Sequence, residues 1–210
     1  MFSFISIEGN IGSGKTSLAR KIANDINGKL ILEEFANNPF LPKFYKDPDK
    51  HAFSLELFFM AERYHQLSKE NVSIDIFSNT TISDYSFFKS KLFAQNNLKD
   101  DELELFSRLY NIMFSSIRRP EILIYLHANI DRLEKNILKR GREYEKNIKK
   151  EYLKNIEKHY FDYLKKQFDF PVIILDVSNI DFIEDENIYK KIFKKIFETD
   201  IKKDIVKIIL

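Results

Sequence analysis

Apolar residues along this chain form short runs that alternate with longer segments of helical period. Five runs have the length, the β-branched content and the flanking turn residues of buried strands. Strands that alternate with amphipathic helices predict an α/β fold, in which a parallel sheet carries crossover helices on both faces. The expected strands cover residues 3–9, 29–34, 80–84, 121–128 and 171–177.

The segments between these runs repeat their apolar positions every three or four residues, as helices do. The last of them alternates apolar pairs with lysines, which predicts a helix docked by its apolar face. No Ser/Gly-rich linker and no internal repeat divides the chain, so residues 1–210 are expected to form a single domain. The expected helices cover residues 15–26, 49–70, 86–117 in two pieces, 130–140, 149–168 and 184 to about 208.

Composition excludes several classes of protein. The chain has 34 basic and 32 acidic residues, and a formal charge of +2 predicts no general attraction to nucleic acid or membranes. It has no cysteine, which excludes a disulfide framework and thiolate zinc sites. The apolar stretch at the N-terminus is shorter than the core of a signal peptide, and no run is long enough to span a bilayer. A cytoplasmic protein is therefore expected.

A glycine-rich loop follows the first expected strand. It matches the pattern Gly, four residues, Gly, Lys, then Ser or Thr, and a helical segment begins at once. In this motif successive backbone N–H groups point at phosphate oxygens, the lysine reaches the β- and γ-phosphates, and the hydroxyl binds Mg²⁺. The sequence therefore predicts a nucleoside triphosphate site. Its expected residues are Gly9, Asn10, Ile11, Gly12, Ser13, Gly14, Lys15, Thr16 and Ser17.

A phosphate loop identifies the donor and leaves the acceptor open. The chain lacks the Asn-Lys-x-Asp stretch with which a GTPase reads guanine. Motors and nucleic-acid-dependent ATPases need extra surface for a track or a strand, which 210 residues barely supply. Phosphoryl transfer to a small molecule is therefore favoured.

The stretch LKRGREYE, residues 138–145, places two arginines around a glycine between two helical segments. Arg140 and Arg142 are expected to close over the transferring phosphoryl group, as part of a lid spanning about residues 138–148. An arginine in this role is worth about 10³ to 10⁵ in rate in comparable enzymes. The alternative is a solvated basic turn.

Two carboxylates, Glu33 and Glu34, end the second expected strand in the stretch LILEEFANNPF. They lie at the carboxyl edge of a parallel sheet, where ligands gather. A mononucleotide kinase binds an anionic acceptor and needs arginine there, whereas a nucleoside kinase needs a base for a neutral hydroxyl. One of the two glutamates is therefore predicted to accept the proton of a 5′-hydroxyl, and a solvated carboxylate is the alternative.

Together these motifs resemble the deoxyribonucleoside kinase family, in particular its bacterial deoxyguanosine and deoxyadenosine kinases. The similarity runs through IEGNIGSGKTSLA, EEFANNPFLPKFYKDP, MAERYHQL, SDYSFFKSKLFA, KRGREYE and LDVSNIDF. It implies a P-loop NTPase-like three-layer fold with a five-stranded parallel sheet, ATP as donor, Mg²⁺, a deoxynucleoside acceptor and a homodimer. The competing interpretations are a nucleoside monophosphate kinase of the thymidylate kinase type and a nucleotide sensor without a small-molecule acceptor.

The resemblance also implies roles for single residues. Glu33 falls on the family's catalytic base, and Tyr45 and Glu145 fall on residues that bind the sugar 3′-hydroxyl. Arg63, the acceptor-site arginine, follows Glu56 by two helical turns, so both are expected on one helix face. The implied catalytic residues are Lys15, Glu33, Arg63, Arg140 and Arg142, and the implied metal ligands are Thr16 and Asp84. ATP is expected to bind to residues 9–17 together with Arg140, Asp181 and Phe182. The acceptor is expected to bind to Glu33, Tyr45, Glu56, Phe59, Arg63, Asp84 and Glu145.

Two of the three departures from the family pattern replace an arginine. Tyr85 stands where the family usually has an arginine, which removes a positive charge near the 5′-oxygen; Arg63 and the lid arginines are expected to compensate. Asn136 stands one turn before the lid arginines, where another arginine is usual. Lys135 or Lys139 is the expected substitute there.

Glu56 falls on the family's base-reading position, where many relatives have glutamine. An amide offers one donor group and one acceptor, which suits adenine or cytosine. An ionised carboxylate offers acceptors only and matches the two adjacent donors of guanine, N1 and N2. Deoxyguanosine is therefore the predicted acceptor, with deoxyadenosine next.

Two helical segments, residues 50–60 and 100–117, are apolar on more than one face. This predicts burial either against a second subunit or inside one large core. The aromatic residues between positions 85 and 93 are expected in the core and the pocket wall. Stacking on nucleic acid is disfavoured for them because no dense basic track accompanies them.

Overall fold

The computed structural model describes residues 2–34, 38–70, 80–167, 169–198 and 205–208. Its strands are β1 (Phe4–Gly9), β2 (Lys29–Ile31), β3 (Thr81–Ser83), β4 (Ile122–His127), β5 (Val172–Asp176) and β6 (Ile205–Ile208). All pair in parallel in one sheet of order β2-β3-β1-β4-β5-β6. The five predicted strands are confirmed, and a sixth is added.

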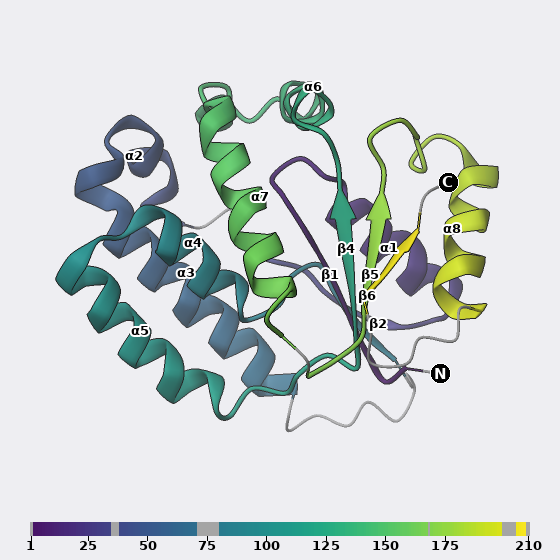
Figure 1. Cartoon of the computed structure of the whole chain (residues 1–210), viewed down its shortest axis with the longest axis horizontal. Helices are drawn as coiled ribbons and strands as arrows, with labels where there is room; N and C mark the ends of the chain where they lie inside the picture. The colour runs from purple at the N-terminus through teal and green to yellow at the C-terminus, as the bar shows by residue number, and fades with distance from the viewer. Residues whose placement is uncertain (1, 35–37, 71–79, 168, 199–204, 209–210) are drawn as a thin grey trace.

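Helices cover both faces of this sheet (Figure 1). Helices α1 and α8 lie on one face, and α3, α4, α5 and α7 lie on the other. The predicted three-layer α/β fold is confirmed. The bounds are α1 (Lys15–Asp25), α2 (Leu41–Lys46), α3 (Pro48–Glu70), α4 (Lys89–Asn97), α5 (Asp100–Phe114), α6 (Ile130–Arg140), α7 (Lys150–Leu164) and α8 (Glu186–Glu198), with a 3₁₀ turn at Glu143–Glu145.

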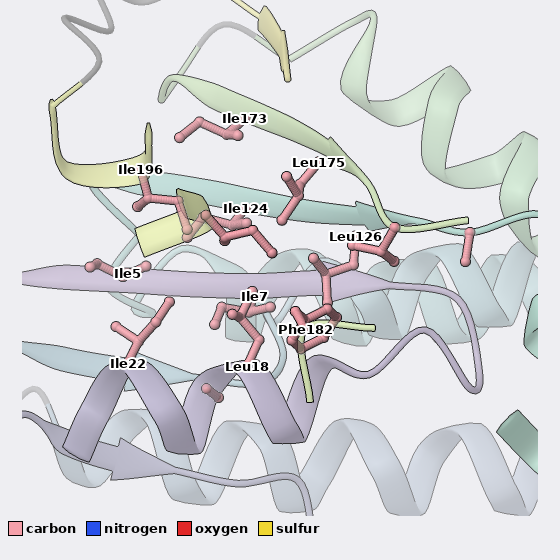
Figure 2. Close-up of a cluster of buried hydrophobic side chains, with 14 of the residues drawn as sticks. Ile5, Ile7, Leu18, Ile22, Ile124, Leu126, Ile173, Leu175, Phe182 and Ile196 are labelled. Carbon is pink, nitrogen blue, oxygen red and sulfur yellow. The ribbon is translucent and has the colours of Figure 1, made fainter. Parts of the chain in front are cut away.

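The central strands are buried on both faces, as parallel strands covered by helices are. Ile5 and Ile7 of β1 and Ile124 of β4 have no exposed surface. They share a core cluster with Leu18 of α1 and Ile196 of α8 (Figure 2). Each such side chain contributes about 1.5 to 3 kcal/mol by leaving water. This core gives the strand ends and the first loop a rigid support.

The aromatic stretch after β3 is core and pocket wall, as predicted. Tyr85, Phe87, Phe88 and Leu92 are buried. Phe93 lines a pocket beside the end of β2. The segment therefore packs inward and offers no open stacking surface.

The C-terminal segment differs from the prediction. A helix was expected to about residue 208, but residues 205–208 form β6 at the sheet edge, parallel to β5, and α8 is described over Glu186–Glu198. Ile208 is buried while Ile205 is 44% exposed. A run of Ile and Val favours extended backbone. Four residues are too few for the apolar spacing to distinguish the period of a helix from that of a strand. Residues 199–204 of the expected helix lie outside the described residues.

The two segments expected to be apolar on several faces have different environments. In α3, Leu55 and Met60 are buried in the core, which favours the one-core interpretation for residues 50–60. In α5, by contrast, Leu105 is 48% exposed and Ile112 is 71% exposed. Within the described part of the chain, no helix combines the length and the apolar character needed to cross a bilayer.

Candidate active site

The glycine-rich loop connects β1 to α1 at the carboxyl edge of the sheet. Gly12 and Gly14 have φ angles of 83° and 95°, values that favour glycine. A methyl group on Gly14 would lie 2.9 Å from the ring of Phe182. Asn136 Nδ2 donates to the carbonyl oxygen of Gly12 at 2.8 Å and holds the loop from α6. The loop is thus shaped to present the N-terminus of α1 to an anion.

Other loop residues support this shape from inside the protein. Gly9, Asn10 and Ser13 are buried. Asn10 Nδ2 donates to the carbonyl oxygen of Leu153 at 2.7 Å, and its own carbonyl oxygen accepts from Lys15 Nζ at 2.9 Å. Burial lowers the pKa of Lys15 to about 8. A bound polyphosphate would favour its charged form.

Two adjacent cavities lie beside the loop. The outer cleft has a volume of about 940 Å³ and is lined by Gly12, Gly14, Ser17 and residues of α6. The inner pocket is about 110 Å³ and is lined by Ile11 and side chains of α2, α3 and α4. Six charged or hydroxylic residues line both cavities and therefore mark their boundary: Lys15, Thr16, Glu33, Asp84, Arg140 and Arg142.

Glu33 lies just beyond β2 at this boundary. Its Oε1 accepts from Arg63 Nη2 at 2.6 Å and Nε at 2.8 Å, and its Oε2 accepts from Lys89 Nζ at 2.6 Å. Burial alone would raise the pKa of Glu33, but Lys89 and Arg63 together hold it well below its usual range. Glu34 is exposed. Among the described residues, cations are paired with Glu33 and not with Glu34.

Asp84, which follows β3, links the end of β2 to the start of α1. Its Oδ1 accepts from the backbone N–H of Glu33 at 2.7 Å, and its Oδ2 accepts from Thr16 Oγ1 at 2.5 Å. The pair of Thr16 and Asp84 therefore offers hard oxygen donors next to the loop, the kind that Mg²⁺ prefers. No group of three metal-ligating side chains is found among the described residues. This donor set suits a metal that takes its remaining ligands from phosphate and water.

Helix α3 directs Glu56, Phe59 and Arg63 into the inner pocket. Glu56 is 1% exposed and Arg63 is 3% exposed, so the predicted common face is confirmed. The Arg63 guanidinium lies 4.9 Å from the centre of the Phe59 ring, and its Nη1 donates to Ser90 Oγ at 2.9 Å. The arginine is therefore fixed by a stacked ring and two polar partners.

The carboxyl group of Glu56 has one occupied and one open oxygen. Asn97 Nδ2 donates to Oε1 at 2.6 Å. Oε2 is buried and has no hydrogen-bond partner among the residues that the structure describes. Burial raises the pKa of Glu56 to about 7. The inner pocket thus contains a carboxyl group that exists in both forms near neutral pH.

The lid contributes Arg140 and Arg142 to the cavity boundary and Glu145 to the inner pocket. Glu145, 4% exposed, accepts from Arg140 and from Arg142, the latter at 3.1 Å. Tyr144 stacks on Tyr45 of α2, with ring centres 6.0 Å apart and planes 19° apart. The lid residues expected near the phosphoryl group and the sugar are therefore brought together, with the arginines paired to Glu145.

Comparison with known proteins identifies the family of this site. Residues 5–202 match the protein family described as deoxynucleoside kinase. The chain is 31% identical over 193 residues to a deoxyguanosine kinase of Bacillus subtilis (strain 168), covering 90% of this chain and 93% of that protein. The chain belongs to the deoxynucleoside kinase family. It is an ATP-dependent phosphotransferase of that family.

Other relatives of this deoxynucleoside kinase are consistent with that assignment. A deoxyadenosine kinase of Lactobacillus acidophilus is 27% identical over 206 residues, covering 91% of this chain and 94% of that protein. A solved structure of deoxyadenosine kinase from M. mycoides with bound dATP superposes with a TM-score of 0.77 at 24% identity, covering 91% of this chain and 99% of that one. The structural match supports the fold.

Lys89 is a functional candidate that sequence reasoning missed in this kinase. Tyr85 is buried and its hydroxyl donates to Gln66 Oε1 at 2.5 Å, so it contributes no charge. Lys89 places an ammonium group on Glu33 instead. Arg63 also contacts Glu33, and the lid arginines line the same cavity boundary while paired with Glu145. A lysine inside the apolar stretch SFFKSKLFA was the available signal.

The remaining candidates for the outer cleft divide into lining and supporting residues. Asp181 lines the cleft and pairs with Arg132 at 3.4 Å. Lys139 also lines it and pairs with Glu184 at 3.5 Å, whereas Lys135 is not among its lining residues. Phe182 is buried in the core behind the loop (Figure 2).

Proposed function

We propose that this deoxynucleoside kinase transfers the γ-phosphoryl group of ATP to the 5′-hydroxyl of a purine deoxynucleoside, with deoxyguanosine preferred and deoxyadenosine next. The observation that carries the proposal is the position of Glu33, which is held by two cations where the outer cleft meets the inner pocket. Relatives named deoxyguanosine kinase and deoxyadenosine kinase support the purine assignment.

On the donor side, the loop N–H groups and Lys15 hold the phosphates, while Gly12, Gly14, Lys139 and Asp181 line the cleft around the nucleotide. Phe182 and the buried loop residues keep the loop in shape from behind. Magnesium, bound by Thr16 Oγ1 and by Asp84 directly or through water, would neutralise phosphate charge. Asp84 also orients Glu33, because the Asp84 carboxylate accepts from the backbone N–H of Glu33.

On the acceptor side, the 5′-hydroxyl donates to Glu33 while its oxygen forms a bond to the γ-phosphorus and ADP leaves; the hydroxyl proton ends on Glu33. A carboxylate held by Arg63 and Lys89 is a weak base. It therefore orients the hydroxyl first and takes the proton late, once the new P–O bond has made that proton acidic. The same two cations stabilise the developing negative charge.

The lid completes the site in this proposal. Arg140 and Arg142 leave Glu145 and bind the transferring phosphoryl group when both substrates are present. Glu145, no longer neutralised, then accepts from the sugar 3′-hydroxyl together with Tyr45. Phe59 packs beside the base, and Glu56 reads its edge.

A nucleoside monophosphate kinase is the competing function. Its acceptor phosphate would have to displace Glu33 from Arg63 and Lys89, the two cations of the inner pocket that are paired with that carboxylate. The test offers ATP with the four deoxynucleosides and, separately, their 5′-monophosphates, and identifies products by mass spectrometry. Deoxyguanosine is expected to give dGMP with the highest kcat/KM. Phosphorylation of monophosphates alone would refute the proposal, and a pyrimidine preference would refute the role of Glu56.

In the proposed function the protein is a homodimer that uses the exposed apolar face of α5, where Leu105 and Ile112 lie. It acts in the cytoplasm on small molecules, without a nucleic-acid or membrane partner, because nucleoside and ATP are the ligands its cavities suit.

Replacing Lys89 with Met is expected to raise the pKa of Glu33, because one of the two cations that lower it is lost. An opposite charge at this range lowers a carboxyl pKa by about 1 to 3 units. Glu33 cannot accept the hydroxyl proton once it is itself protonated. The acid limb of the kcat/KM profile should therefore move to higher pH by about 1 to 3 units. Lys91→Met is the matched control, since Lys91 Nζ lies over the Tyr110 ring. An acid limb unchanged from wild type would contradict the role of Lys89.

A further inference from the structure

One oxygen of Glu56 is free to contact a bound base. Asn97 Nδ2 occupies Oε1 at 2.6 Å, and Oε2 is buried without a hydrogen-bond partner among the described residues. Asn96 Nδ2 donates to Asn97 Oδ1 at 2.8 Å, which orients the Asn97 amide with its N–H groups toward Glu56. Tyr152 Oη lies 3.2 Å from the same nitrogen. Any proton on Glu56, a residue that lines the inner pocket, is therefore carried by Oε2, the oxygen without a partner.

The two purines have opposite hydrogen-bonding character at N1, the atom that such an oxygen contacts. Guanine carries a hydrogen on N1 and is a donor there, whereas adenine N1 is an acceptor. An ionised carboxylate oxygen only accepts, while a protonated one donates. A buried donor facing a donor, or an acceptor facing an acceptor, leaves both groups unsatisfied and costs more than a missed contact.

We propose that the proton on Glu56 Oε2 selects between the two purines, and that Asn97 is the positioning residue that keeps this oxygen open. The ionised form favours deoxyguanosine and the protonated form favours deoxyadenosine. The inference rests on the proposed function and adds to it a dependence of acceptor choice on pH.

The groups around Glu56 support both forms near neutral pH. Burial raises its pKa, Arg63 and the Asn97 hydrogen bond lower it, Glu33 raises it and Lys89 lowers it, with a balance at about 7. The other titratable groups that face the inner pocket are Lys15, Tyr45, Asp84, Arg140, Arg142, Glu145 and Tyr152.

The raised pKa of Glu56 determines how the choice between the two purines changes with pH. Below about pH 7 the carboxyl group is mostly protonated and donates to adenine N1; above it the carboxylate accepts from guanine N1. The ratio of kcat/KM for deoxyguanosine to kcat/KM for deoxyadenosine should therefore rise with pH. By linkage, bound deoxyguanosine lowers the pKa of Glu56 and bound deoxyadenosine raises it.

The test is a competition assay, in which the full-length enzyme receives both purine deoxynucleosides and ATP in one tube between pH 5.5 and 8. Both acceptors use the same donor site, lid and Glu33, so titration of those groups cancels in the product ratio. The ratio is expected to rise about tenfold or more from pH 6 to pH 8, because one coupled ionisation changes it up to about tenfold per unit. A ratio that stays flat overturns the inference.

Two variants separate the proton switch from a structural effect. Glu56→Gln keeps the shape and offers a fixed amide, so its ratio is expected to lose its pH dependence and to favour deoxyadenosine. Asn97→Ala removes a hydrogen bond that lowers the pKa of Glu56, so the midpoint, meaning the pH at which the product ratio changes from favouring deoxyadenosine to favouring deoxyguanosine, should move to higher pH. The matched control is Asn111→Ala on the exposed side of α5, which should leave the midpoint in place.

The outcomes distinguish this inference from the proposed function. An Asn97→Ala variant with lower rates but an unchanged midpoint would show a merely structural role and overturn the part assigned to Asn97. Product formed from both purines at a ratio independent of pH overturns the switch and leaves the kinase function standing. Absence of product from every deoxynucleoside overturns the proposed function and this inference with it.

Discussion

Replacing Glu33 with Gln is expected to lower kcat by about 10² to 10⁴, with little change in ATP affinity. Glutamine keeps the size of the side chain but cannot take the 5′-hydroxyl proton. It also leaves Arg63 and Lys89, which now pair with Glu33, without their counter-charge. Single-turnover rates with deoxyguanosine measure the loss, and equilibrium binding of ATP measures the affinity.

The control for this prediction is the adjacent carboxylate. Glu34 is exposed, so Glu34→Gln is expected to change kcat by less than about twofold. A Glu33→Gln enzyme that turns over at a near-normal rate would remove Glu33 from its proposed role. Equal losses in both variants would point to a general electrostatic effect of the acidic pair instead.

Removing both lid arginines is expected to lower kcat by about 10³ to 10⁵. The double variant Arg140→Ala with Arg142→Ala eliminates the two lid cations that bind the transferring phosphoryl group in the proposed closed state. The loss should appear in kcat more than in KM, because these contacts form in the transition state. Single-turnover kinetics with saturating ATP measure it.

The double variant also leaves Glu145 buried without its two cations, which by itself could destabilise the lid. Adding Glu145→Gln removes that unpaired charge, so a triple variant that stays slow assigns the loss to the arginines. Lys146→Ala is the matched control, since Lys146 lies in the same lid, pairs with Glu143 and lines neither cavity. Recovery of rate in the triple variant would contradict the proposed closure.

The local motifs of this enzyme were readable because their partners lie close in sequence. The loop from Gly9 to Thr16 depends on glycine conformation and on the helix that follows directly. The common face of Glu56 and Arg63 follows from helical period alone, and the structure confirms it. The strand candidates were readable for the same reason, since a buried parallel strand is a continuous apolar run.

The contacts that complete the site join segments far apart in the chain. Lys89 and Glu33 are separated by 56 positions, Asn97 and Glu56 by 41, and Asp84 and Thr16 by 68. No local pattern marks these pairs, because a buried lysine or asparagine on a helix has many possible partners until the helices are packed. The departure at Tyr85 indicated that a positive charge was missing but not which residue supplied it.

The amino-acid sequence by itself determined the order of the first five strands and of the longer helices, the phosphate loop and the carboxylate at the end of β2. These features depend on backbone propensity and on residues within a few positions of each other. Only the tertiary structure decided that the last residues join the sheet as β6, that Lys89 holds Glu33 and that Asn97 leaves one oxygen of Glu56 open. Those outcomes depend on which distant segments pack together, because burial and charge pairing are set by the whole core rather than by any one stretch.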